Sequence, residues 1–149
     1  MSMVENIAGS CIWSHVSIVN LLLLEKGAHV NVQGRKYGNT MWAAAYGGHE
    51  TIVNLLLEKG ADVNLQGGEY DNALHKAASG GDEIIVDLLL EKGADVNAWS
   101  GTYCNPLWAA ASGGHVTIVN LLLVKGADIN SQVRFYCNAL QYNIRDGTI

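Results

Sequence analysis

The chain has 149 residues and a formal net charge of −5, with nine lysines and arginines spread along its length. Nucleic-acid binding is not expected, because contacts with phosphates need a concentrated basic surface. Hydrophobic residues make up 49% of the sequence and charged residues 15%, which favours a folded domain over a disordered chain. No apolar run approaches the roughly 20 residues of a membrane span, and the first residues lack a signal-peptide pattern, so we expect a soluble, cytoplasmic protein.

One phrase recurs along the chain at a fixed period. Its clearest copies are residues 48–64, 81–97 and 114–130, each of which runs through a leucine-rich segment to Gly-Ala-Asp-Val-Asn or a close variant. The glycine of this phrase returns every 33 residues, at Gly27, Gly60, Gly93 and Gly126. A period of this length indicates a repeat architecture, in which neighbouring units cover each other's apolar surface.

Each unit is predicted to contain two short helices. The first follows an asparagine, a strong N-cap residue, then runs through an alanine-rich stretch and ends at a glycine pair. Pro106 stands at the first helical position of one copy, where proline is favoured. The second helix carries the leucine-rich segment, and the periodic glycine supplies its left-handed C-cap. The predicted N-cap residues are Asn39, Asn72, Asn105 and Asn138.

The repeats predict a single domain over residues 1–149. Four full units are expected at about 5–38, 39–71, 72–104 and 105–137, followed by a half-unit at 138–149 that would act as a C-terminal cap. The second helix of a unit carries more apolar surface than one helix pair can cover. We therefore expect each unit to be stable only when it is stacked on its neighbours.

The recurring motifs resemble the ankyrin repeat. Gly-Ala-Asp-Val-Asn, the Ile-Val-x-Leu-Leu-Leu helix and the preceding Gly-His are signatures of that family, and residues 72–75 stand where it has Thr-Pro-Leu-His. The resemblance covers about residues 5–149 and implies an all-α fold, an ankyrin-repeat solenoid of stacked helix-turn-helix units with hairpin-like fingers. The segment Gln66–Leu74 is similar to ankyrin arrays of filamentous fungi. Tyrosines replace the family's finger glycine, and they either stack on one another or contribute to recognition: Tyr37, Tyr70, Tyr103 and Tyr136.

The resemblance also implies a binding surface. Ankyrin solenoids bind protein or peptide partners on a concave face built from the fingers and the first helices. The residues projected onto that face vary between units, either because a partner reads them or because solvent tolerates them. We favour a partner, since Trp99 and Phe135 are costly to expose without a use. The partner-binding candidates are Arg35, Lys36, Tyr46, Glu69, Asp71, Trp99, Thr102, Arg134 and Phe135.

Three further candidates, Trp42, His75 and Trp108, occupy the position of the family's Thr-Pro-Leu-His histidine, which is structural there. The tryptophans either fill enlarged core space, the interpretation we favour, or form the walls of a pocket in the groove. The pocket interpretation leads to an alternative function, a small-molecule-binding protein that could act as an unusual isomerase or cyclase. A third hypothesis is a purely structural segment of a longer array.

Groups that could hold a metal or perform chemistry do not converge in the sequence. The histidines that open the second helices, which the resemblance implies are loop tethers, would lie about 10 Å apart in successive units, too far to share a metal ion. The aspartates of the repeated phrase fit turns, and no catalytic motif is recognisable, so we expect no cofactor and lean against an enzyme. The cysteines, expected to be free thiols, are Cys11, Cys104 and Cys137.

Overall fold

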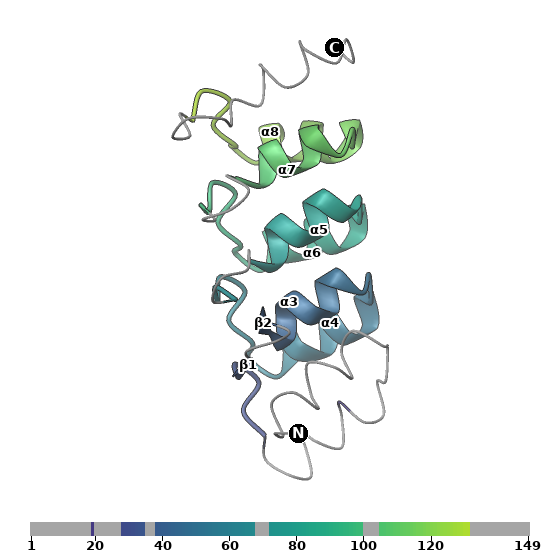
Figure 1. The fold of residues 1–149 in the computed structure, drawn as a ribbon, viewed down its shortest axis with the longest axis vertical. Helices are drawn as coiled ribbons and strands as arrows, with labels where there is room; N and C mark the ends of the chain where they lie inside the picture. The colour runs from purple at the N-terminus through teal and green to yellow at the C-terminus, as the bar shows by residue number, and fades with distance from the viewer. Residues whose placement is uncertain (1–18, 20–27, 35–37, 68–71, 100–104, 132–149) are drawn as a thin grey trace.

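The fold, taken from a computed structural model, is described here for residues 19, 28–34, 38–67, 72–99 and 105–131. Six helices within these residues form three pairs that stack along one long axis (Figure 1). The first helices of the pairs are α3 (Thr40–Tyr46), α5 (Ala73–Gly80) and α7 (Pro106–Ser112), which we call the first layer. The second helices are α4 (Glu50–Glu58), α6 (Glu83–Glu91) and α8 (Val116–Val124), the second layer. This is the all-α repeat solenoid predicted from the sequence.

A short hairpin precedes the first of these helix pairs. Strand β1 (Gln33–Gly34) pairs antiparallel with β2 (Gly38–Asn39), with Gln33 opposite Asn39. Gly38 has a φ of 60°, in the left-handed region that residues with a Cβ rarely adopt. The hairpin leads directly into α3, so it is the finger of this unit.

Asparagine caps start the first helices, as predicted. The Oδ1 atom of Asn39 accepts a hydrogen bond from the backbone N–H of Trp42 at 2.7 Å. Asn72 and Asn105 accept the same bond, each at 2.8 Å, from residues three positions further along their own helices. Each bond satisfies a backbone donor that the helix itself leaves unpaired. The predicted cap at Asn138 lies outside the described residues.

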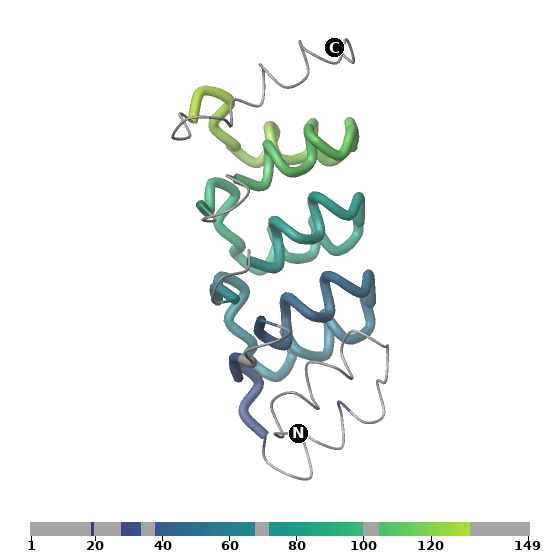
Figure 2. The backbone as a smooth tube through the Cα atoms, in the orientation of Figure 1, coloured from purple at the N-terminus to yellow at the C-terminus, as the bar shows by residue number. Residues whose placement is uncertain are grey.

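Buried alanines hold the first layer together. Ala44, Ala77 and Ala110 occupy equivalent positions in successive units, and each is fully buried where α3, α5 and α7 pack. Side chains this small let neighbouring helices approach closely. The smooth trace in Figure 2 shows the resulting regular succession of helix pairs. Most of the fully buried isoleucine, leucine and valine side chains come from the second layer, and they are Ile52, Val53, Leu56, Ile85, Val86, Leu89, Ile118 and Leu122.

The turns after the second helices connect each unit to the next. Asn64 Oδ1 accepts a hydrogen bond from the backbone N–H of Asp95 at 2.8 Å, and its Nδ2 donates to the carbonyl of Gly93 at 3.1 Å. Asn97 makes the equivalent pair of bonds to the following unit. Each predicted turn aspartate, such as Asp62, accepts a bond from the backbone two residues later. The repeated Asp-x-Asn therefore closes its own turn and contacts the next one.

None of the helices in the described residues has the length and apolar content needed to cross a membrane.

Candidate binding surfaces

Two of the predicted partner-binding residues, Tyr46 and Trp99, lie in the described part of the chain. The three residues predicted to share the histidine position, Trp42, His75 and Trp108, also do. The other partner-binding candidates lie outside the described residues, as do the finger tyrosines, the three cysteines and the half-unit 138–149. They are Arg35, Lys36, Glu69, Asp71, Thr102, Arg134 and Phe135.

Tyr46 belongs to a cluster of aromatic rings and one lysine on the first layer. It is the last residue of α3, and 54% of it is exposed. Its ring stacks on Trp42, with centroids 5.2 Å apart and planes 15° from parallel. Lys76 of α5 places its Nζ 4.7 Å from the Tyr46 centroid and 5.8 Å from the Trp42 centroid. A cation held over two rings in this way is attracted by about 0.5–1 kcal/mol at an exposed site.

Trp99 occupies a repeat position at which the two preceding fingers have a glutamine. The Gln33 amide donates a hydrogen bond to the carbonyl of Gln66 at 2.8 Å, and the Gln66 amide donates to the carbonyl of Trp99 at 3.3 Å. These three residues are 33 positions apart, so they occupy one repeat position. At that position Trp99 replaces a short polar amide with an indole that is 53% exposed.

The residues at the histidine position lie largely inside the stack. Trp42 is 8% exposed and His75 is 2% exposed, while Trp108 is half-buried. Trp42 packs within the hydrophobic core of the solenoid. Little of either the Trp42 or the His75 side chain is therefore left for a ligand to contact.

His115 acts as the predicted tether between units. Its Nε2–H donates a hydrogen bond to the backbone carbonyl of Ser79, at the end of α5, over 3.1 Å. The ring fits against two glycines, since a Cβ added to Gly81 or Gly113 would come within 2.6 Å of it. Among the described histidine, cysteine, aspartate and glutamate side chains, no group of three or more is arranged to hold a metal ion.

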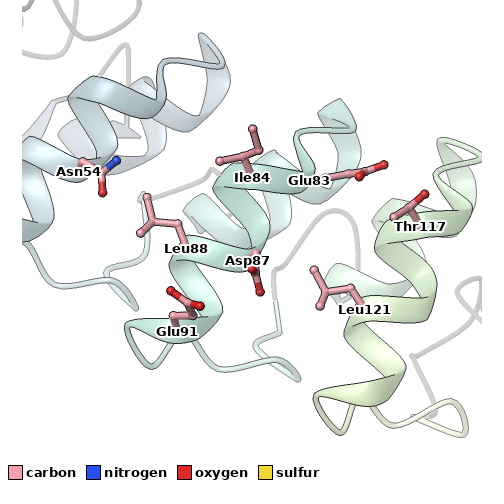
Figure 3. Close-up of a pocket in the computed structure, with 8 residues that line it drawn as sticks. All are labelled: Asn54, Glu83, Ile84, Asp87, Leu88, Glu91, Thr117 and Leu121. Carbon is pink, nitrogen blue, oxygen red and sulfur yellow. The ribbon is translucent and has the colours of Figure 1, made fainter.

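The second layer carries a groove that the sequence did not reveal. It has a volume of about 460 Å³ and lies over α4, α6 and α8 (Figure 3). Thr117 and Leu121 extend into it from α8 towards α6, and Asn54 borders it from α4. The remaining lining residues come from α6, and they are Glu83, Ile84, Asp87, Leu88 and Glu91.

Comparison with known proteins agrees with this geometry. The family model for ankyrin repeats matches residues 40–133, over three copies. This interval contains all six described helices and more than half of the chain. A comparison with curated proteins found no match. Ankyrin repeats are in general modules for protein–protein interaction. On the family match and the stacked, asparagine-linked helix pairs, the chain belongs to the ankyrin-repeat family.

Proposed function

We propose that the chain binds a protein or peptide on its concave face, formed by the fingers and the first layer. The single observation that carries this proposal is the exposed indole of Trp99. Glutamine at the same position makes a bond between fingers in two other units, so the framework has no need of a tryptophan there. Tryptophan is also among the residues that contribute most to the energy of protein interfaces.

Tyr46 also supports binding on this face, because it too is an exposed aromatic residue at a position where other units carry a polar one. Its equivalents in the next two units are Ser79 and Ser112, whose hydroxyls bond back to their own helices. The tyrosine instead leaves half of its surface exposed, and its ring is held in place by a buried tryptophan. A fixed aromatic ring loses little conformational freedom when a partner binds.

Lys76 adds a charge to this surface. No carboxylate within the described residues forms an ion pair with its Nζ, which lies over the two rings instead. We expect the partner to place an acidic group beside this lysine and an apolar or aromatic group against Tyr46. Arg35 and Lys36 of the first finger would extend the basic flank, while Glu69 and Asp71 would favour basic groups at the second. Phe135, with Thr102 and Arg134 nearby in the repeat pattern, would complete the anchor around Trp99.

The proposal is tested with two substitutions taken from the chain's own repeats, Tyr46→Ser and Trp99→Gln. Partners captured from a lysate of the source organism are compared between the wild-type chain and the double variant by quantitative mass spectrometry. Proteins that bind this face should be strongly depleted in the variant. For a purified partner, each substitution should weaken binding by at least about 1–2 kcal/mol.

The matched control is Glu58→Gln, an exposed substitution on the second layer. It should retain the same partners. All three chains should also melt within a degree or two of one another, because serine and glutamine are the residues that other units carry at these positions. Partners that survive Tyr46→Ser and Trp99→Gln together would show that binding uses another face.

A further inference from the structure

The three second helices are near-copies of one another and differ only at outward positions. Compared with α4, helix α6 changes two residues, Thr51 to Ile84 and Asn54 to Asp87. Helix α8 changes two others, since Val116 and Val124 replace glutamates. The isoleucine, valine and leucines that face inward are identical in all three helices. The departures are therefore confined to the surface of the second layer.

Three of these four departures make the surface more apolar where solvent alone would favour polar residues. Ile84 is 61% exposed, Val116 is 65% exposed and Val124 is 83% exposed. Each replaces a threonine or a glutamate that another unit carries at the same place. Exposed apolar side chains that gather on one face are typical of an interaction surface.

The groove described above lies among these changes. Ile84 and Asp87 line it, and Val124 follows Thr117 and Leu121 on the same side of α8, seven positions after the first of them. The groove thus has apolar side chains from both α6 and α8, and it is open to solvent along the second layer (Figure 3).

A row of carboxylates runs along α6 beside this apolar surface. Glu83, Asp87 and Glu91 are four residues apart, so they follow one another on one side of the helix and repel each other. Asp87 of this row forms an ion pair with Lys125, with 3.9 Å between its Oδ1 and the lysine Nζ. Asp87 stands where α4 has Asn54, so it places a third carboxylate between Glu83 and Glu91, and the single lysine offsets only part of this charge. A cationic partner would relieve this repulsion.

We propose that the groove over α6 and α8 is a second docking site, for an amphipathic helix that carries a row of lysines or arginines beside an apolar stripe. The basic row would face Glu83 and Asp87, and the apolar stripe would contact Leu121 and Val124. Because this site lies on the second layer, it is independent of the binding face proposed above. A partner could therefore be held on each side of the solenoid.

A second copy of this chain does not fit the groove equally well. The exposed residues of its described second helices are carboxylates, apolar side chains, threonines and asparagines, and lysines stand only at the helix ends, at Lys59, Lys92 and Lys125. No described helix offers a row of basic residues at helical spacing. The charge of the groove thus favours a different, basic partner.

The test uses a synthetic helical peptide of about four turns, with lysines along one side and leucines beside them. Its binding is measured by fluorescence anisotropy at near-physiological salt, so that distant charges are screened. The key variant is Ile84→Thr with Asp87→Asn, which makes α6 identical in sequence to α4 and should therefore keep the fold. We expect it to lower the peptide's affinity about tenfold or more. Tyr46→Ser, on the first layer, should leave the affinity unchanged.

A second variant separates docking from general attraction to an acidic protein. Val124→Glu restores the residue that α4 and α6 carry, adds negative charge and removes apolar surface. If the peptide docks in the groove, Val124→Glu should bind it more weakly than the wild type, because apolar contact is lost. If the peptide is only attracted to negative charge, the variant should bind it more tightly. The proposal is overturned if Val124→Glu binds more tightly, if the α6 variant binds like the wild type, or if the peptide does not bind at all. Sedimentation that shows dimers dissociated by Val124→Glu would also overturn it, by assigning the face to a second copy.

Discussion

Asparagine shows how single residues hold this chain together. Asn39 is buried and has two partners, because its Oδ1 accepts from the backbone of Trp42 and its Nδ2 donates to the carbonyl of Leu65 at 2.9 Å. The first bond caps a helix and the second connects that helix to the next finger. One side chain therefore contributes both to local structure and to stacking.

The two roles of Asn39 can be separated by substitution. Asn39→Ser keeps a cap acceptor but loses the bond to Leu65, whereas Asn39→Ala loses both. We expect the alanine variant to be less stable than the serine variant by about 1 kcal/mol, the usual value of a helix cap. Urea unfolding followed by circular dichroism measures the difference. Equal stability of the two variants would mean that the cap contributes nothing here.

His115 provides a second test at this scale. His115→Ala removes the bond to the Ser79 carbonyl, and it should lower the free energy of unfolding by about 0.5–1.5 kcal/mol. His29→Ala is the matched control, because His29 is exposed and should tolerate the change within about 0.5 kcal/mol. Chemical denaturation of both variants gives the comparison. Equal losses at the two positions would contradict a specific tether at His115.

The sequence predicted local roles of residues better than long-range ones. The asparagine caps could be predicted because a cap and its partner are three residues apart. The bonds of Asn64 to Gly93 and Asp95 could not, because they depend on how closely two units stack. The same applies to the hydrogen bond from the Gln66 amide to the carbonyl of Trp99, which joins two neighbouring fingers.

At the scale of elements, the second helices contribute most of the fully buried isoleucine, leucine and valine side chains of the described core. Leu56 and Leu89 occupy equivalent positions in α4 and α6, and both are fully buried. Truncating either to alanine should destabilise the chain by about 2–5 kcal/mol, because the lost contacts leave a cavity that close neighbours cannot fill. Urea melts would measure the loss. Val124→Ala, on the exposed side of α8, should cost less than about 0.5 kcal/mol.

Helices were predictable from the sequence, whereas the surfaces they expose were not. The asparagine, the alanine run and the glycine pair define α3, α5 and α7 because each acts within a few residues. The groove could not be predicted because its signal in the sequence is small. Ile84 stands where α4 has Thr51, and single substitutions of this kind also occur at surface positions where any residue is tolerated. The substitution at Ile84 becomes informative only once the structure shows that this side chain is exposed and lies beside the carboxylates of α6. The unit boundaries predicted at 39–71, 72–104 and 105–137 remain a prediction.

At the scale of the whole molecule, the described units are held together by contacts between neighbours, since α3 and α7 both pack on α5, and α4 and α8 both pack on α6. The described units share buried alanines in the first layer and asparagine bonds in the turns. In such an array the free energy of unfolding is approximately a sum over units and interfaces. A substitution at the interface between two units should therefore reduce the cooperativity with which these units unfold more than it reduces the stability of either unit alone.

Ala77 in the central unit is the place to test this coupling, since it is fully buried where α5 packs between α3 and α7. Ala77→Leu adds a bulky side chain at this contact and should cost about 1–3 kcal/mol or more, because the first helices cannot then approach closely. We expect hydrogen exchange to separate α3 and α4 from α7 and α8, and the urea transition to broaden as the two sides unfold independently. Lys76→Leu adds leucine to the same helix at a half-buried position and should preserve a single sharp transition. If Ala77→Leu also unfolds in one step with an unchanged urea dependence, the units are coupled by contacts outside the first layer, and the turn asparagines become the principal link between them.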